Sequence, residues 1–132
     1  MQTIAILADE RPGLLTDISY ILSKENIRVQ NIGIEAVGGK TAIVLAVRDG
    51  AKTKEALAKN GFEVIDRDAI VLHLPDYVKK IDYIKNKLSE SRIRLKQFKV
   101  LGCDENNSLA AILVDKPRKA FKLLSEFVVS VD

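Results

Sequence analysis

The apolar positions of this chain follow one pattern that occurs twice, 66 residues apart. The pattern is distinctive because its apolar positions run along odd residue numbers, skip, and resume along even ones. These positions are Ile27, Val29, Ile32 and Ile34 in the first copy, and Ile93, Leu95, Phe98 and Val100 in the second. Side chains of a strand alternate between two faces, so the skip predicts a bulge near Gln30–Asn31 and again near Lys96–Gln97. We therefore interpret the chain as two copies of one unit, residues 1–66 and 67–132.

The first copy predicts the order strand, helix, strand, strand, helix, strand. An unbroken apolar run indicates a buried strand, apolar positions spaced by three and four indicate a helix, and Gly38–Gly39 indicates a two-residue hairpin turn. The expected strands are Thr3–Ala8, Ile27–Val37, Thr41–Val47 and Phe62–Ile65, and the expected helices are Gly13–Glu25 and Ala51–Asn60. Repeated in the second copy, this order predicts an α+β fold. It consists of two ferredoxin-like βαββαβ units in tandem, with antiparallel sheets and helices on one face.

The first and third strands of such a unit lie in the middle of its sheet. Thr3–Ala8 and Thr41–Val47 are apolar at nearly every position, which is typical of strands that are buried on both faces. Two helices cover only one face of a sheet. We therefore expect pairing between copies and between chains, and hence a homo-oligomer, with a dimer as the simplest case.

Composition narrows the function classes. The 132 residues contain one cysteine and carry a mild net charge of +3. A lone cysteine forms no internal disulfide and no zinc cluster, and no apolar run approaches the ~18 residues of a membrane span. Without a secretory signal, we expect a cytoplasmic protein with no membrane, metal or cofactor. The central strands lack the aromatic residues that stack on bases, so we expect no nucleic acid.

The segment Asp9–Glu10–Arg11–Pro12–Gly13–Leu14 is the candidate binding loop. Proline suits the first position of a helix, and a glycine without a side chain lets another group approach the backbone. Backbone N–H groups at a helix start favour a carboxylate, and the two neighbouring acids favour an ammonium. This combination suits a free amino acid. The alternative is a tight turn whose acids only complement the helix dipole.

These residues resemble the signature of the ACT domain, a small ligand-binding regulatory module. The resemblance covers the first copy, including the strand that carries Asn31 and Ile32, and the whole chain resembles a tandem ACT protein without a catalytic domain. It implies a module that binds an amino acid at an interface and regulates a partner enzyme or regulator by allostery. The implied ligand-binding residues are Asp9, Glu10, Arg11, Pro12, Gly13 and Leu14, with Asn31 and Ile32 facing them, and no residue is catalytic.

The second copy departs from this pattern at the equivalent turn. It has Lys79 in the place of Gly13 and Gln97 in the place of Asn31. We therefore expect one ligand site per chain, on the first copy. Two other functions stay open. One is an interaction module that binds no ligand, and the other is an acylphosphatase-like hydrolase that uses Arg11 and Asn31.

Overall fold

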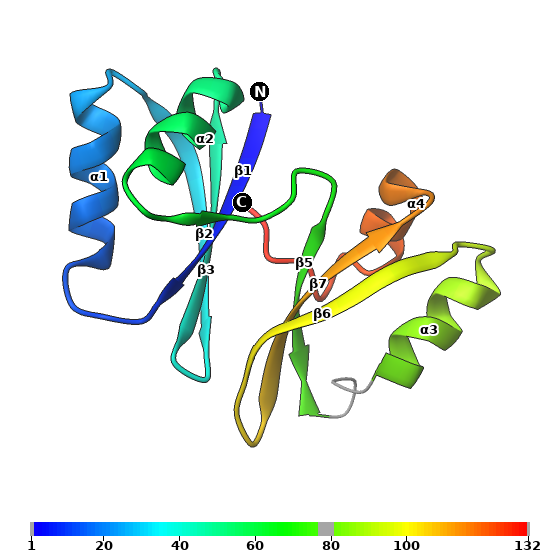
Figure 1. Ribbon diagram of the computed structural model, residues 1–132. Helices are drawn as coiled ribbons and strands as arrows, with labels where there is room; N and C mark the ends of the chain where they lie inside the picture. The colour runs from blue at the N-terminus through cyan, green and yellow to red at the C-terminus, as the bar shows by residue number, and fades with distance from the viewer. Residues whose placement is uncertain (1, 77–80, 132) are drawn as a thin grey trace. The chain divides into compact units, whose positions relative to one another are not determined.

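A computed structural model describes residues 2–76 and 81–131. Its contacts divide the chain into two compact units. Unit 1 is Met1–Arg67 with Ser130–Asp132, and unit 2 is Asp68–Val129. Within the described residues each unit has an antiparallel sheet and two helices, so the chain is α+β and compatible with two ferredoxin-like units in tandem (Figure 1).

Unit 1 has the element order that the apolar pattern predicts. Its elements are β1 (Gln2–Asp9), α1 (Leu14–Lys24), β2 (Val29–Val37), β3 (Lys40–Val47), α2 (Gly50–Lys59) and β4 (Glu63–Val64). The sheet order is β2-β3-β1-β4, which places β1 and β3 in the centre as predicted. Every residue of β3 from Thr41 to Val47 is buried, in agreement with its unbroken apolar sequence.

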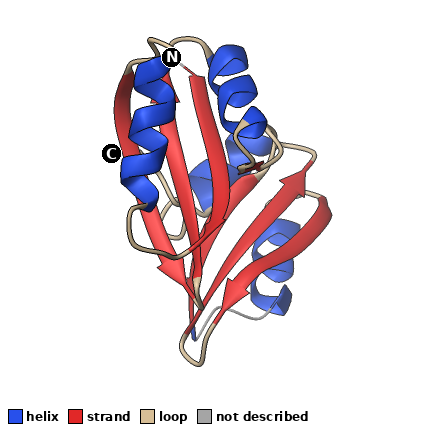
Figure 2. Cartoon of the chain, turned by 60° about the vertical axis from the view of Figure 1, so that its left-hand side comes forward, coloured by secondary structure: helices blue, strands red, loops and turns tan. Residues whose placement is uncertain are grey.

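Both helices of unit 1 pack on the same face of the sheet (Figure 2). The core on that face combines alternate residues of the two central strands with the apolar stripe of α1 and one leucine of α2. Its fully or nearly fully buried members include Ile6, Ile43, Leu45, Ile18, Leu22 and Leu57. The prediction of helices on one face is therefore confirmed for this unit.

The start of α1 differs from the prediction. Gly13 has a φ of 80°, in the left-handed region, and is the residue before the first helical residue, Leu14. Pro12 therefore precedes the helix and does not occupy its first position, so that prediction was wrong. Glycine is favoured at residue 13 because of its backbone conformation. A Cβ there would meet no atom within 4 Å, so space is not the constraint.

Unit 2 repeats most of this arrangement. Its elements are β5 (Ile70–Pro75), α3 (Ile81–Glu90), β6 (Leu95–Cys103), β7 (Asn107–Val114) and α4 (Pro117–Leu123), and its sheet order is β5-β7-β6. Both helices again contribute to the core on one face, which includes Ile84, Leu88, Ile112, Ala120 and Leu124. The predicted difference at Lys79 lies outside the described residues.

Irregular features recur at the same repeat positions. The register of β2 against β3 shifts between Val29 and Asn31, and that of β6 against β7 shifts between Leu95 and Gln97. Both predicted bulges are thus confirmed. A second shift in β6, between Val100 and Gly102, has no sequence signal that we identified.

The ends of α1 and α3 also match. Asn26 and Arg92, 66 residues apart, both have left-handed backbone, with φ of 57° and 58°. In each unit the next residue closes the helix with a backbone hydrogen bond: Ile27 N donates to Leu22 O (2.8 Å), and Ile93 N donates to Leu88 O (2.9 Å). The repeat therefore extends to the hydrogen bonds that end a helix.

Unit 2 departs from the predicted order at its end. Where unit 1 has β4, the described part of unit 2 has one isolated bridge between Leu72 and Val128, supported by hydrogen bonds from His73 N to Phe127 O (2.7 Å) and from Val129 N to Val71 O (2.9 Å). The expected fourth strand is thus reduced to a short segment beside β5.

Ser130 and Val131 belong to unit 1 and lie beside β2. A Cβ built on Gly33 would lie 1.9 Å from the carbonyl oxygen of Ser130, far closer than atoms approach one another. Gly33 is therefore required because the backbone of the tail occupies the place of a side chain.

Candidate functional site

The β1–α1 loop is fixed at both ends by contacts within unit 1. Glu10 N donates to Gly39 O in the β2–β3 turn (2.8 Å), and Leu14 N donates to Arg11 O (3.4 Å). The side chain of Leu14 is buried under the helix, whereas the loop residues before it are exposed. The loop thus presents its polar groups to solvent from a defined position.

Two ion pairs flank this loop. Asp9 and Lys40 are opposite each other where β1 pairs with β3, and Lys40 Nζ lies 2.6 Å from Asp9 Oδ1. Arg11 Nη2 lies 2.8 Å from Asp17 Oδ2, which joins the loop to the first turn of α1. All four side chains are at least 42% exposed, so each pair contributes little to stability.

The Asp9–Lys40 pair shifts both titrations. The hydrogen bond from Lys40, and then its positive charge, hold the pKa of Asp9 below its ordinary value. The same hydrogen bond and the charge of Asp9 raise the pKa of Lys40, with a smaller contribution from the charge of Glu63. Both groups are therefore charged at neutral pH.

A pocket of about 560 Å³ lies against this loop, entirely within unit 1. It is bounded by the end of β1, the loop, one side of α1 and the α2–β4 turn. Its apolar lining residues are Leu7, Ala8, Leu14, Ile21 and Phe62; its charged ones are Asp9, Arg11, Asp17, Lys40 and Glu63; Tyr20, Asn60 and Gly61 complete it. This volume is within the range of small-molecule sites.

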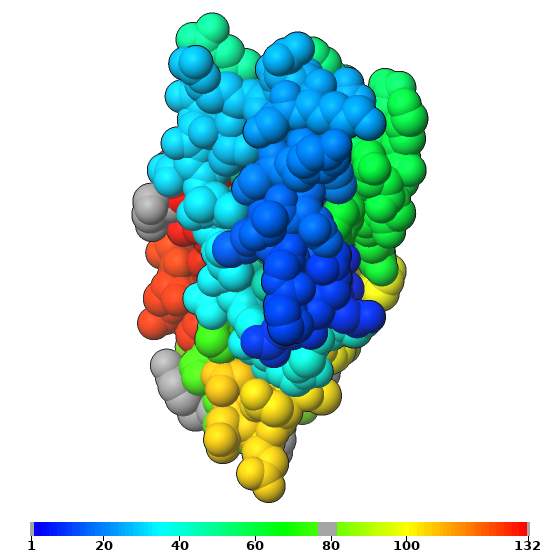
Figure 3. Space-filling view, turned by 90° about the vertical axis from the view of Figure 1, so that its left-hand side faces the viewer, coloured from blue at the N-terminus to red at the C-terminus, as the bar shows by residue number. Residues whose placement is uncertain are grey.

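Figure 3 looks onto this side of unit 1, with α1 and the loop in blue, β2 and β3 in cyan, and the α2–β4 region in green. In this view α1 has β2 on one flank and the green segment on the other. The pocket lies on the flank with the α2–β4 turn, since Asn60, Gly61, Phe62 and Glu63 line it.

The structure brings together some of the candidate residues. Asp9, Arg11 and Leu14 line the pocket, whereas Glu10, Pro12 and Gly13 belong to the same loop without lining it. Asn31 and Ile32 lie on β2 and are not among its lining residues; the side chain of Asn31 accepts a hydrogen bond from Ile32 N (3.2 Å).

Sequence reasoning missed ten of the thirteen lining residues, among them Asp17, Tyr20, Lys40 and Glu63. A signal for Lys40 exists, because it directly follows the Gly38–Gly39 turn and an antiparallel pairing of β1 with β3 places it opposite Asp9. The place of Glu63 at the pocket depends on the residue at which β4 begins, and the spacing of apolar residues does not predict that residue.

Other candidate chemistry is limited. Within the described ranges 2–76 and 81–131, no group of three or more His, Cys, Asp and Glu side chains is arranged to hold a metal ion. Over the same ranges, no helix combines the length and apolar character needed to span a bilayer. The basic residues Arg92, Arg94 and Lys96 do not share a strand face, because Arg92 lies in the turn after α3 and Lys96 lies at the bulge.

No family model and no curated protein matches this chain. Among solved structures it is similar to protein BT0572 from Bacteroides thetaiotaomicron, with 22% identity and a TM-score of 0.50 over 94% of this chain and 85% of that one. It is also similar to the regulatory subunit of aspartate kinase from Thermus thermophilus, with 14% identity and a TM-score of 0.43 over 94% of this chain and 90% of that one. A third similar structure is the acetolactate synthase small subunit from Thermotoga maritima, with 13% identity and a TM-score of 0.40 over 98% of this chain and 90% of that one.

At these identities the likeness concerns the fold and not the ligand or the partner. The resemblance of this chain to the ACT domain stays a prediction from its sequence.

Proposed function

We propose that this protein is a non-catalytic regulatory module that binds a free amino acid beside the β1–α1 loop and transmits binding to a partner protein. The observation that supports this function is the composition of the pocket in unit 1. It combines acidic, basic and apolar side chains around one loop. A zwitterion with an apolar stem requires all three kinds of contact.

The two exposed ion pairs make the charged contacts exchangeable. Because solvent-exposed pairs contribute at most ~1 kcal/mol each, a ligand replaces them at little cost. The α-carboxylate of an amino acid takes Arg11 from Asp17, and its α-ammonium takes Asp17 in return. The ligand then bridges the loop and α1, which the ion pair joins in its absence.

Transmission follows from linkage. A ligand that binds one arrangement of the loop better than another shifts the population toward that arrangement, and a partner that distinguishes the two then responds. The proposal needs no catalytic group.

The decisive experiment is a thermal-shift screen of the twenty amino acids followed by calorimetric titration of the hits. A ligand that binds only the folded chain raises the melting temperature. Arg11→Gln is expected to weaken binding roughly tenfold, because a charge-assisted hydrogen bond is lost. Arg28→Gln, an exposed arginine outside the pocket, is the matched control and leaves binding unchanged. A full screen without any shift contradicts the function.

We further propose that two chains pair through β2. This strand lies at the edge of the unit 1 sheet, and Ile32 and Ile34 on it are 40% and 42% exposed. An edge strand with exposed apolar side chains is a template for pairing with another chain. Such pairing brings Asn31 and Ile32 to an interface, where the ACT resemblance expects them. Ile34→Lys is expected to convert dimer to monomer in sedimentation equilibrium, and a monomeric wild-type chain contradicts the pairing.

The two competing functions are separated by direct assays. A hydrolase requires Arg11 and Asn31 to act on one phosphoryl group, so acyl-phosphate hydrolysis that is abolished by Arg11→Gln would establish it. An interaction module without a ligand predicts partner binding that no amino acid changes.

A further inference from the structure

The charges that line the pocket do not balance. Its five charged side chains are three carboxylates and two cations. Asp9 pairs with Lys40, and Arg11 pairs with Asp17. Across the described part of the chain, Glu63 forms no ion pair. The lining therefore carries one net negative charge, and that charge is located at Glu63.

The position of Glu63 explains its lack of a partner. It begins the two-residue strand β4 and pairs through its backbone with Leu7 of β1. On the other side of β1, Asp9 is opposite Lys40, and the charges of both Asp9 and Glu63 act on Lys40. The Lys40 ammonium thus interacts with the carboxylates of Asp9 and Glu63, and it forms its ion pair with Asp9.

A neutral zwitterion does not correct this imbalance. When its carboxylate binds Arg11 and its ammonium binds Asp17, the pair that it replaces was itself neutral. The charge of Glu63 then stays uncompensated. A third charge on the ligand, of positive sign, compensates it, and a negative one adds to the repulsion.

The remaining lining residues suit a cationic side chain on an apolar stem. Leu7, Leu14 and Ile21 offer apolar surface to methylene groups, and Tyr20 and Phe62 offer aromatic rings, which attract cations. Tyr20 is 68% exposed, so its ring is accessible to a ligand.

We propose that the amino acid bound in this pocket is a cationic one, whose side-chain ammonium or guanidinium is held by Glu63. This inference rests on the proposed function and adds its ligand class. Glu63 is then a specificity-determining residue, and Arg11 and Asp17 hold the groups that all amino acids share.

The test compares L-lysine with L-norleucine, which has the same unbranched stem without the ammonium, by calorimetric titration of the full chain. L-lysine is expected to bind about fivefold more tightly, as for one additional charge contact in a solvent-exposed site. L-glutamate is expected to bind more weakly than L-norleucine. Raising the ionic strength reduces the preference for L-lysine, because salt screens exposed charges.

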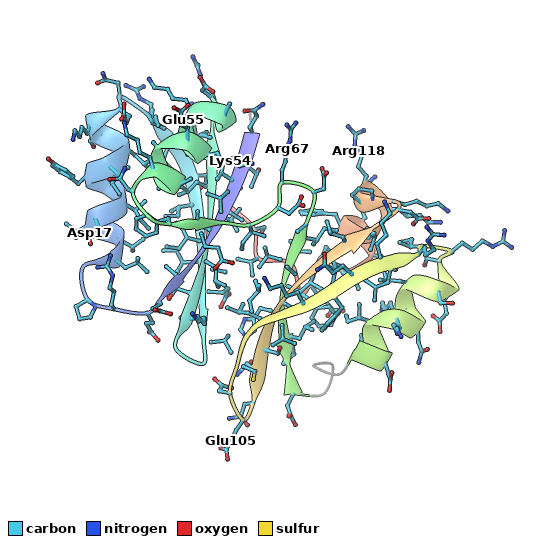
Figure 4. All side chains as sticks on the ribbon, viewed as in Figure 1. Asp17, Lys54, Glu55, Arg67, Glu105 and Arg118 are labelled. Atoms are coloured by element: carbon cyan, nitrogen blue, oxygen red, sulfur yellow. The ribbon has the colours of Figure 1, made fainter. Side chains whose placement is uncertain are left out.

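Two variants test whether Glu63 is the source of the preference for L-lysine over L-norleucine. Glu63→Gln keeps the shape of the side chain and removes its charge, so L-lysine is expected to fall to the affinity of L-norleucine while L-norleucine is unaffected. Glu55→Gln on α2 is the matched control, since Glu55 is exposed and outside the pocket, and it preserves the preference; Figure 4 shows Glu55 on α2 and Asp17 on α1.

The outcomes distinguish this inference from the function on which it rests. Equal affinities for L-lysine and L-norleucine overturn the cationic ligand, and a preference that survives Glu63→Gln overturns the role of Glu63. Either result leaves an amino-acid module in place. If no amino acid binds the wild-type chain, the proposed function fails and the ligand class fails with it.

Discussion

Units 1 and 2 share their first two-thirds and differ in their last third. Both have the bulge in the second strand and the left-handed residue after the first helix, at positions 66 residues apart. After the third strand they diverge. Unit 1 has the ten-residue α2 and the paired strand β4, whereas unit 2 has the seven-residue α4 and a single bridge.

This difference coincides with the site. The α2–β4 turn of unit 1 supplies Asn60, Gly61, Phe62 and Glu63 to the pocket, and it belongs to the third that unit 2 does not repeat. The shared part of the repeat builds the sheet and its core. Glu63, which we propose distinguishes the ligand, thus lies where the two units have diverged.

The largest expected effect comes from matched truncations in the shared part. Leu22 and Leu88 occupy the same repeat position and are 3% and 0% exposed. Leu22→Ala and Leu88→Ala are each expected to lower the free energy of unfolding by about 3 kcal/mol, measured by urea denaturation. Hydrogen exchange should place the loss in the unit that carries the change. A cost below ~1 kcal/mol for one of the pair would mean that the units are not packed alike.

A smaller effect is expected at residue 13. Its positive φ suits glycine and is tolerated by asparagine, but it strains a β-branched residue. Gly13→Val should cost about 1–2 kcal/mol in thermal unfolding, and Gly13→Asn should cost clearly less. Equal costs would show that side-chain size, and not the backbone, decides this position.

Helix starts provide a contrast of about 1 kcal/mol. The side chain of Asp49 accepts a hydrogen bond from Lys52 N (3.0 Å) at the start of α2, whereas Lys116 makes no side-chain cap at the start of α4. Asp49→Ala should therefore lower stability by about 1 kcal/mol, and Lys116→Ala by less, in urea titrations. The reverse order would contradict the assigned caps.

The smallest effect is the pH dependence of the Asp9–Lys40 pair. Because the pKa of Asp9 is lowered in the folded chain, its contribution is present above the ordinary pKa of aspartate and is lost as pH falls through the lowered value. Because the pKa of Lys40 is raised, its contribution is present below the ordinary pKa of lysine and is lost as pH rises through the raised value. The pair thus stabilises the fold at neutral pH.

The measurement is a ¹³C NMR titration of the Asp9 carboxyl. Lys40→Met should return the pKa of Asp9 toward its ordinary value, whereas Lys52→Met, on α2 outside the pocket, should leave it lowered. An unchanged pKa in the Lys40 variant would assign the shift to another group.

Local patterns predicted the elements of unit 1 and both bulges because period-two alternation is visible within a few residues. They also located the Gly38–Gly39 turn, where both glycines have positive φ. Pro12 was expected at the first helical position, but it precedes the helix. The sequence Pro12–Gly13 is compatible with either helix start. The backbone of Gly13 decides between them.

The pocket was only partly predictable because it depends on pairing across the sheet. Asp9, Arg11 and Leu14 lie within six residues of sequence, so they can be recognised as parts of one loop. Lys40 and Glu63 lie far away in sequence, and only the pairing of β3 and β4 with β1 brings them to the pocket. Asn31 and Ile32 were included through the resemblance, which concerns an interface between domains. Their place in a ligand site stays a prediction.

The packing of the Ser130 backbone against Gly33 has a consequence for how the protein can be divided into fragments. Because Ser130 and Val131 belong to unit 1, unit 2 is joined to unit 1 at both of its ends. A fragment that stops at residue 66 would lack the backbone segment that packs against Gly33 of β2. The two units are therefore not interchangeable, because unit 1 is complete only when the segment that follows unit 2 packs against β2.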